Sequence, residues 1–377
     1  MKRILVAPNS FKECAYSTTT ARLIAKSLES MITDSEGDYE IVQFPISDGG
    51  DGFLNVIKKH FNTVTRYYNI SSMFDVNSII CPVEYSAEKR TIYIESAKTV
   101  GLNLVPVNYR NPLILNTAPL GELLIRINEE IESGHIYADI VVIGIGGTAT
   151  NDMGMGLLSE FGLVIYDPLG NELQPVPKNF TNAFGIEDPY IDLKYKIQVV
   201  ADVENILLGE NGATRVFAKQ KGADESGIEM MEQGFTNLLN ILHVSDEARN
   251  TLSGAGGGLA AAFQLFFNAD SINAKDFILN YLGLASKNSN FQLVITGEGI
   301  LDNQTLLNKG TKIIIDYFDG KNCDIFFICG ENKLYRELDF LIVVELNKYF
   351  NSSKESIENF PKGIELACKM IIKNMKK

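Results

Sequence analysis

Glycines, carboxylates and hydroxyl side chains gather in five short segments of the chain, several of which directly follow an apolar run. Such runs are typical of buried strands, and an open α/β sheet binds its ligands where its strands end. Backbone amides of glycine-rich turns can hold an anion, while carboxylates can coordinate Mg²⁺ or accept a proton. These residue types therefore indicate a site for a phosphorylated ligand.

The segment 144–156 carries the strongest signal, with five glycines in thirteen residues after a strand predicted over 140–143. Its consecutive backbone N–H groups precede a helix expected to begin near Asp152, which is an arrangement that binds phosphate. A purely structural role would not require so many small and polar residues in one place. The phosphate- or nucleotide-binding residues expected here are Gly146, Gly147, Thr148 and Asn151.

Two further segments lie after the first two predicted strands. Ser10 and Lys12 follow a strand predicted over 4–7 and could hold phosphate, and the alternative is a helix N-cap with a solvated lysine. Asp48 follows a strand predicted over 41–46, in the run Ser-Asp-Gly-Gly-Asp-Gly. Its carboxylate suits Mg²⁺ coordination or general base catalysis, and the alternative is a plain turn.

The remaining two segments each allow two interpretations. Gly256 and Gly257 precede an alanine-rich helix, and they could form a second phosphate cradle or let that helix pack closely. Glu298 and Asp302 place two carboxylates beside the end of a strand predicted over 293–296. They could take part in a site, and the alternative is a strand-to-helix turn that is capped by the aspartate.

Several common catalytic motifs are absent from the sequence. It has no Gly-x-x-x-x-Gly-Lys-Ser/Thr, no Gly-x-Gly-x-x-Gly after the first strand and no Gly-x-Ser-x-Gly. These absences disfavour P-loop nucleotidases, dinucleotide-binding enzymes and serine hydrolases. The three histidines lie in or beside predicted helices, away from the glycine-rich segments, and the five cysteines show no zinc-site spacing. The remaining inventory suits phosphoryl transfer with Mg²⁺, where positioning and charge neutralisation provide most of the catalysis.

The charge and hydropathy of the chain restrict its partners and its location. The 34 basic and 47 acidic residues give a net charge of −13, which disfavours nucleic acid and anionic membranes as partners. The first apolar run ends at Pro8, too early for a signal peptide, and no run reaches the roughly 18 apolar residues of a membrane span. Scattered cysteines are typical of reduced thiols, so we expect a cytoplasmic protein.

The length of 377 residues favours two domains, and short β-rich runs alternate with amphipathic helical stretches as in α/β proteins. We expect a Rossmann-like parallel-sheet domain formed from both termini (1–75 plus 288–377), with a mixed α/β domain (76–287) inserted in it. Further expected elements are strands over 64–70, 78–85, 91–95, 325–329 and 341–346, a hairpin over 164–171, and helices over 18–31, 53–61, 121–133, 309–318 and 356–373.

A set of segments spaced along the whole chain matches the pattern of a known family. The segments are 7–12, 47–52, 94–97, 101–102, 121–123, 144–156, 201–203, 220–223, 256–258 and 293–299. In order and spacing they resemble the bacterial glycerate kinase family, of the type that typically makes 2-phosphoglycerate from D-glycerate and ATP. The resemblance implies a Rossmann-like domain with an inserted α/β domain and an ATP-dependent kinase.

The chain departs from the family pattern at several positions. Ile300 stands where the family usually has arginine after Gly-Glu-Gly, and Asn308 stands where it has the glycine of a Gly-Lys pair. Ala118, Val100 and Ala218 mark three further differences. Loss of the arginine removes a bidentate contact to a carboxylate or phosphate that a lysine would not replace. The acidic residues and the main glycine-rich segment are intact, so the departures concern the substrate rather than the kinase chemistry.

The resemblance and the residue types together predict phosphorylation of D-glycerate, with 2-phosphoglycerate as the favoured product and with ATP and Mg²⁺ as cofactors. Lys12 and the amides of segment 144–150 are expected to neutralise the transferred phosphoryl group. Asp152 is a candidate base. The candidates for holding Mg²⁺ or for accepting the substrate's proton are Asp48, Asp202 and Glu298, and those for contacting the substrate are Lys221, Glu298 and Asp302.

Two alternatives to glycerate kinase are open at this point. One is a kinase of the same fold that acts on a related small hydroxy acid or sugar acid. The other is a non-enzymatic descendant that binds nucleotide or acid, a reading motivated by Ile300 and Asn308. The expected partners are glycerate and ATP, with no nucleic acid and no membrane, and a homodimer is a candidate assembly.

Overall fold

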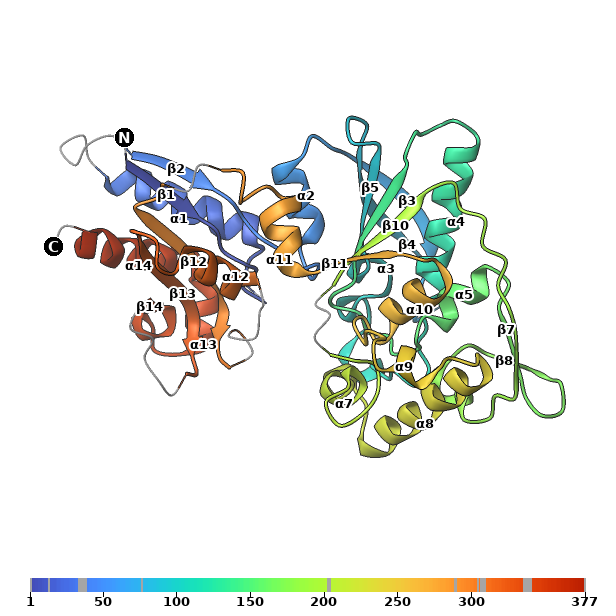
Figure 1. Ribbon diagram of the computed structural model, residues 1–377. Coiled ribbons are helices and arrows are strands. Elements are labelled where there is room, and N and C mark those ends of the chain that lie inside the picture. Colours follow the sequence, from blue (N-terminus) through green and yellow to red (C-terminus); the bar gives the residue numbers. More distant parts are fainter. Residues whose placement is uncertain are drawn as a thin grey trace. The chain divides into compact units, whose positions relative to one another are not determined.

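Two sheets, each with its own hydrophobic core, divide the chain into two units (Figure 1). The computed structural model describes residues 2–12, 14–32, 39–75, 77–201, 205–287, 290–303, 305, 310–334 and 341–375. The terminal unit comprises residues 1–61 and 274–377, and the inserted unit comprises residues 62–273. The boundaries expected from the sequence, 75/76 and 287/288, each fall 14 residues later along the chain.

Strand pairing and ring packing account for where the units divide. β3 (Val64–Ser71) pairs antiparallel with β4 (Ser78–Ser86) along its whole length, so β3 belongs to the inserted sheet. The π-helix Phe277–Tyr281 belongs to the terminal unit, where the Phe277 ring lies 5.5 Å from the Phe53 ring, measured between centroids. The contact between Phe53 and Phe277 joins residues distant in the chain, which apolar runs do not reveal.

The terminal unit is built on five parallel strands in the order β14-β13-β12-β1-β2. The central strands β1 and β12 are buried on both faces, because Leu5 and Val294 are as inaccessible as their neighbours Ile4 and Ile295. This explains why they read as continuous apolar runs. The strands are β1 (Lys2–Val6), β2 (Tyr39–Gln43), β12 (Leu293–Leu301), β13 (Asp324–Asn332) and β14 (Ile342–Glu345).

Amphipathic helices cover this parallel sheet. α1 (Ser17–Met31) buries Ala21, Ile24 and Leu28 on one face, and it packs beside α14 (Phe360–Met375) (Figure 1). The remaining helices are α2 (Phe53–His60), α11 (Ala274–Asp276), α12 (Gly310–Phe318), the 3-10 helix η6 (Leu346–Tyr349) and α13 (Ser353–Glu358).

The single helix expected over 356–373 is two helices in the structure. α13 ends at Glu358 and α14 begins at Phe360. Pro361 accounts for the break, because it lacks the amide hydrogen that a continuous helix would use and its ring clashes with the preceding turn. The apolar periodicity continued across the break and so concealed it.

The inserted unit has a six-stranded mixed sheet in the order β11-β10-β6-β5-β4-β3. Four strands are parallel, and β4 and β3 run antiparallel at one edge. The other strands of this sheet are β5 (Thr91–Glu95), β6 (Ile140–Gly144), β10 (Lys196–Val200) and β11 (Asp270–Ile272). Its principal helices are α4 (Ala118–Glu132), α5 (Met155–Glu160), α7 (Ala213–Phe217), α8 (Glu225–Ile241) and α10 (Leu259–Phe266).

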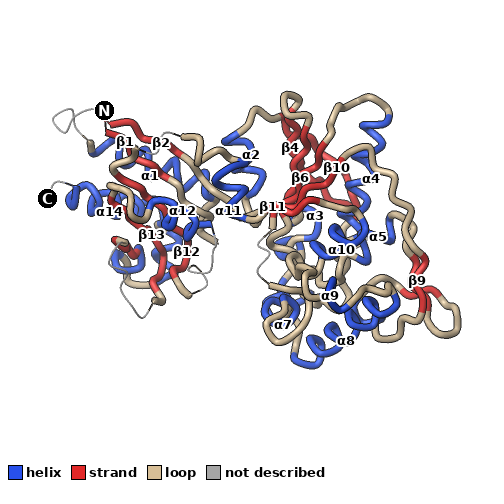
Figure 2. Tube along the Cα trace, viewed as in Figure 1, coloured by secondary structure: helices blue, strands red, loops and turns tan. Residues whose placement is uncertain are grey.

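The predicted hairpin forms a small antiparallel sheet in the inserted unit (Figure 2). β7 (Val164–Tyr166) pairs with β8 (Glu172–Leu173) and with β9 (Gly185–Glu187). The Asp167 carboxylate closes the turn, since its Oδ1 accepts hydrogen bonds from the amides of Leu169 (2.8 Å) and Asn171 (2.9 Å). The hairpin prediction is confirmed.

The predicted fold class is also confirmed: the ends of the chain form a parallel-sheet α/β unit, and the middle forms a mixed one. In both sheets the parallel strands place the loops at their carboxyl ends along one edge. In the described parts of the chain, no helix combines the length and the apolar character that a membrane span needs.

Candidate active site

The loops that follow β1 and β2 in the terminal unit contact each other. The Ser10 hydroxyl donates a hydrogen bond to the carbonyl oxygen of Asp51 (3.0 Å). Asp48 is half-buried in the same loop, where its Oδ1 accepts a hydrogen bond from the Gly50 amide (3.2 Å). Two of the predicted segments thus meet at the carboxyl ends of adjacent parallel strands.

β12 brings a third predicted segment to the same edge of the terminal sheet. The Asn9 amide donates a hydrogen bond to the carbonyl oxygen of Gly297 (2.9 Å), and a Cβ atom at Gly299 would lie 3.5 Å from the Lys12 nitrogen. The Lys12 side chain is exposed and forms no ion pair with the residues described. The predicted residues brought together here are Ser10, Lys12, Asp48 and Glu298.

Glu298 lies within β12 and not after it, because the strand continues to Leu301 in register with β13. The expected end of this strand at 296 was therefore wrong. The backbone is close to β13, since a Cβ atom at Gly297 would lie 2.0 Å from the carbonyl oxygen of Ile328. The Glu298 carboxylate accepts a hydrogen bond of 2.6 Å from the hydroxyl of Thr311 on α12.

Asp302 takes part in a tight turn. Its Oδ1 accepts a hydrogen bond from the Thr305 amide (3.0 Å), and its own amide donates to the Thr305 hydroxyl (3.2 Å). This reciprocal pair is the capped turn that was the alternative interpretation. A contact between Asp302 and the substrate stays a prediction.

The loop between β6 and α5 in the inserted unit presents unpaired backbone N–H groups. Among the residues that the structure describes, none accepts a hydrogen bond from the amides of Gly146, Gly147 or Thr148. The loop is nevertheless held in place, because the Ala149 amide donates to the carbonyl oxygen of Val100 (2.8 Å). Consecutive free amides in a fixed loop are suited to binding an anion.

Lys221 adds a buried ammonium to this loop. Its Nζ donates hydrogen bonds to the carbonyl oxygen of Thr150 (2.7 Å) and to the hydroxyl of Thr148 (3.2 Å), and the residue is only 4% exposed. Burial lowers the pKa of Lys221 to about 8, and the negative charge of Asp152 opposes this shift. The 3-10 turn that carries the lysine ends at Gly222, which has a left-handed φ of 100°.

Asp152 is fully buried, and both of its carboxylate oxygens accept hydrogen bonds. Oδ2 accepts from the amide and the hydroxyl of Thr117 (both 2.8 Å) and from the Gly156 amide (3.0 Å), while Oδ1 accepts from the Gly154 amide (3.3 Å). Burial raises the pKa of the Asp152 carboxyl, and these hydrogen bonds oppose the shift. The carboxylate thus connects the starts of α4 and α5.

The segment with three consecutive glycines packs directly on this loop. Gly256, Gly257 and Gly258 have left-handed φ values of 67°, 72° and 84°. A Cβ atom at Gly257 would lie 2.2 Å from the carbonyl oxygen of Thr150, and the Gly257 carbonyl accepts a hydrogen bond from the Met153 amide (3.0 Å). The glycines of this segment therefore pack closely on the loop, and a role in holding phosphate stays a prediction.

Two buried polar atoms beside these glycines have no hydrogen-bond partner among the residues described. They are the Thr150 hydroxyl oxygen and Oδ1 of Asn151. Nδ2 of Asn151 points to the Thr214 hydroxyl (3.5 Å) and to the sulfur of Met231 (3.3 Å). Buried polar atoms normally have partners, so these two indicate a place where a ligand or a water completes the structure.

The described residues provide some, but not all, of the oxygen ligands that a Mg²⁺ ion needs. Asp202 lies outside the described residues, as does Asn308. Within the described ranges, no group of three or more His, Cys, Asp or Glu side chains is placed to hold a metal ion. Asp48 and Glu298 still offer carboxylate oxygens, and Mg²⁺ is usually held by one or two carboxylates together with substrate phosphates and water.

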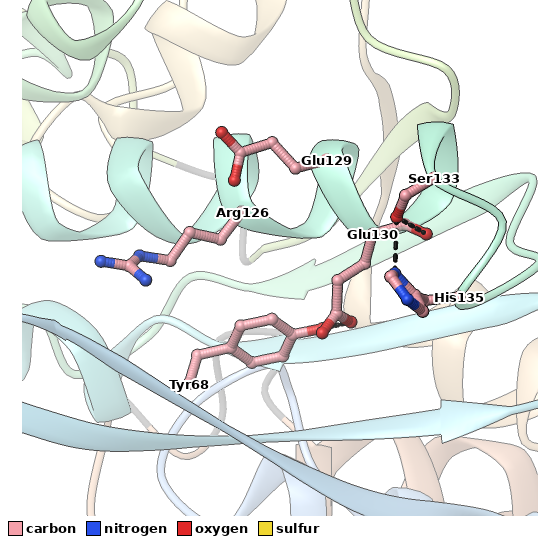
Figure 3. A pocket seen from close by; sticks show the side chains of 6 residues that line it. All are labelled: Tyr68, Arg126, Glu129, Glu130, Ser133 and His135. Atoms are coloured by element: carbon pink, nitrogen blue, oxygen red, sulfur yellow. Dashed lines mark hydrogen bonds between the residues drawn. The ribbon is translucent and has the colours of Figure 1, made fainter.

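A hollow of about 440 Å³ lies elsewhere on the inserted unit (Figure 3). Several of its polar groups are already paired, since Glu130 accepts a hydrogen bond of 2.6 Å from the Tyr68 hydroxyl and Ser133 lies 2.7 Å from Nδ1 of His135. Burial raises the pKa of Tyr68. None of the predicted site residues lines this hollow, which carries no functional assignment here.

Two threonines that hold predicted site residues escaped the sequence analysis. Thr117 bonds to Asp152 and Thr311 bonds to Glu298. Thr117 lies directly before α4, but the helix was expected to begin at residue 121, so this position gave no signal. Thr311 had none, since its partner lies 13 residues away on a strand.

Comparison with known proteins agrees with the fold and with the resemblance seen in the sequence. The model of the glycerate kinase family matches residues 4–376. A Neisseria meningitidis glycerate kinase is 32% identical over 81% of this chain and 80% of its own, and an Escherichia coli glycerate 2-kinase is 31% identical over 81% and 79%. A Salmonella typhimurium LT2 crystal structure with the provisional name glycerate kinase 2 has a TM-score of 0.74 at 25% identity, covering 100% of this chain and 98% of that one. The chain belongs to the glycerate kinase family, as a divergent member.

Proposed function

We propose that this protein transfers the terminal phosphoryl group of ATP to glycerate, with 2-phosphoglycerate as the favoured product. The observation that carries the proposal is the fixed loop after β6, where the free amides of Gly146, Gly147 and Thr148 accompany the buried ammonium of Lys221. Membership of the family supports the kinase chemistry, and the names of the relatives support glycerate as the acceptor.

Phosphoryl transfer spreads negative charge over the oxygens of the moving group, and fixed N–H donors and cations stabilise that charge. In the inserted unit we assign this role to the loop amides and Lys221, with further binding groups at Asn151, Gly256 and Gly257. In the terminal unit, Ser10 supplies a hydroxyl and Lys12 a free ammonium at the edge of the sheet.

Mg²⁺ is the cofactor we propose with ATP. When bound, the ion neutralises charge on the phosphate oxygens. Asp48, Asp202 and Glu298 are the residues that would hold it, because carboxylate oxygens are the donors it prefers. We propose Asp48 or Asp202 as the group that accepts the proton of the substrate hydroxyl.

We propose that Asp152 positions the loop, in place of the base role expected from the sequence. A base must reach the proton it removes, whereas Asp152 is buried and all four of its hydrogen bonds come from the protein. Its effect on catalysis then comes through the loop amides and through the charge it places near Lys221.

One observation favours a second candidate substrate class, a related small hydroxy acid or sugar acid. Ile300 replaces an arginine of the family pattern and is 43% exposed on β12. An apolar side chain there removes a charged contact and leaves room for a different acceptor. A panel of hydroxy acids and sugar acids, each tested with ATP, distinguishes this candidate from glycerate.

A location in the cytoplasm and a homodimeric assembly are further parts of the proposal. The acidic net charge of −13 supports a protein that works apart from nucleic acid and anionic membranes. Analytical ultracentrifugation of the purified chain tests the dimer, and a monomer at micromolar concentration would remove it from the account.

The proposed function is tested by ADP release from purified protein with Mg²⁺-ATP and D-glycerate, and by NMR identification of the product. We expect ADP to appear only when an acceptor is present, with phosphorus on the 2-oxygen of the product. ADP release with a sugar acid but not with glycerate would favour the second candidate. No acceptor-dependent release across the panel would refute the kinase assignment for this chain.

A further inference from the structure

We propose that Thr311 is a positioning residue, which fixes the carboxylate of Glu298 at the edge of the terminal sheet. The Thr311 hydroxyl donates a hydrogen bond of 2.6 Å to Oε1 of Glu298. Thr311 is fully buried in the first turn of α12, while Glu298 is half-buried on β12. The inference rests on the proposed function, because it concerns a residue to which that function gives a role.

The backbone around Glu298 is already constrained on both sides. A Cβ atom at Gly297 would lie 2.0 Å from the carbonyl oxygen of Ile328, so glycine is needed for β12 to approach β13. On the other side, Gly299 lies against the backbone of Lys12. The backbone at Glu298 is therefore fixed, and mainly its side-chain torsions can still change. The hydrogen bond from Thr311 restrains these torsions.

A hydroxyl group suits this role in two ways. A hydrogen bond to a carboxylate is shorter and stronger than one between neutral groups, and 2.6 Å is within the range for such a bond. A buried hydroxyl without a partner would also destabilise the fold, so Thr311 and Glu298 favour one arrangement together. With Oε1 directed to Thr311, the orientation of the whole carboxylate group is defined.

The test compares T311V, T311A and T311S with wild type, and E298Q with the double variant E298Q/T311V. Removing the hydroxyl should lower kcat by about 10-fold or more, because the bond to a charged group is lost. T311S keeps the hydroxyl and should remain near wild type. If Thr311 acts through Glu298, the double variant should be no slower than E298Q, which is the signature of coupled residues.

Three results would overturn the inference: unchanged kcat in both T311V and T311A, loss of kcat in T311S equal to that in T311V, or additive losses in the double variant. Thermal unfolding identifies any variant that does not fold, and T311A then replaces T311V in the comparison.

A second measurement separates this inference from the proposed function. The ¹³C signal of the Glu298 carboxyl, assigned by its absence in E298Q, should move in T311V and stay in place in T311S. An unmoved signal in T311V refutes the positioning role even if the kinase is active. A wild-type protein that phosphorylates no acceptor refutes the proposed function while this signal still tests the contact.

Discussion

Lys221 and Asp152 show how buried charges can organise a binding loop without themselves being exposed. The ammonium binds the loop through Thr148 and Thr150. The carboxylate joins the amides of Gly154 and Gly156 to the amide and hydroxyl of Thr117, which lies before α4. Asp152 was singled out by its glycine-rich segment, and Lys221 by the resemblance to the family pattern. Their burial could not be predicted, because the partners lie 35 to 73 residues away in the chain.

Substitution of Lys221 should reduce turnover and change how stability depends on pH. K221M removes a donor and a charge from the proposed phosphate site, so kcat/KM should fall by about 100-fold or more. In the folded protein the pKa of Lys221 is about 8, below its ordinary value of 10.5. Between these pH values the unfolded chain binds more protons, so the stability of wild type should rise with pH relative to K221M.

Urea unfolding of both proteins from pH 7 to 11 measures this difference. The free energy of unfolding of wild type minus that of K221M should be constant below pH 8 and should increase up to about pH 10.5. A difference that stays flat across this window would contradict the buried, perturbed lysine.

Substitution of Asp152 by asparagine should destabilise the fold as well as slow the reaction. Both oxygens of the Asp152 carboxylate accept hydrogen bonds, but an asparagine side chain has only one oxygen. Its NH₂ group would face backbone N–H donors, which should lower the free energy of unfolding by about 2 kcal/mol or more. D48N is the matched control, because Asp48 is half-buried and, among the residues described, accepts one amide hydrogen bond, from Gly50. If D152N lost turnover with unchanged unfolding in urea, the positioning role would fail and the base role would return.

At the scale of elements, the apolar runs predicted most strands correctly and their ends less well. β12 was expected to end at 296, but it continues to Leu301 because β13 pairs with it through the glycines. The helix expected over 356–373 is broken at Asn359, two residues before Pro361. Local composition indicates where a strand or helix exists. Its end depends on the pairing of an adjacent strand, as for β12, or on a single residue such as Pro361.

Close packing of the segment Gly256–Gly258 can be tested with one variant in it and a control variant at Gly170. G257A should destabilise the inserted unit strongly, because the new methyl group would meet the carbonyl oxygen of Thr150 at 2.2 Å. Gly170 also has a left-handed φ, of 81°, but nothing lies within 4 Å of its Cβ position. G170A should therefore show only the backbone strain of about 1 kcal/mol. Equal losses in the two variants would mean that close packing at Gly257 is unimportant.

At the scale of the whole molecule, the family pattern and the two hydrophobic cores are the features that the sequence predicted best. Fold class and order of segments could be predicted because glycines, acids and apolar runs alternate locally along the chain. The boundaries between the units, at 61/62 and 273/274, could not be predicted from composition, because they depend on the pairing of β3 with β4 and on the contact between Phe53 and Phe277.

The inserted unit should fold by itself. One large cluster of buried residues, from Tyr68 to Phe263, lies wholly within residues 62–273. A chain of residues 62–273 should therefore unfold in urea in one cooperative transition, followed by circular dichroism. A gradual, non-cooperative loss of signal would show that this core needs the terminal unit.

The central claim is that the loop after β6 holds the phosphate oxygens that take part in transfer. A crystal structure with Mg²⁺, a non-hydrolysable ATP analogue and glycerate tests it most directly. The account predicts phosphate oxygens within hydrogen-bond distance of the amide nitrogens of Gly146, Gly147 and Thr148. Phosphates bound in another part of the molecule, with these amides facing only water, would contradict it.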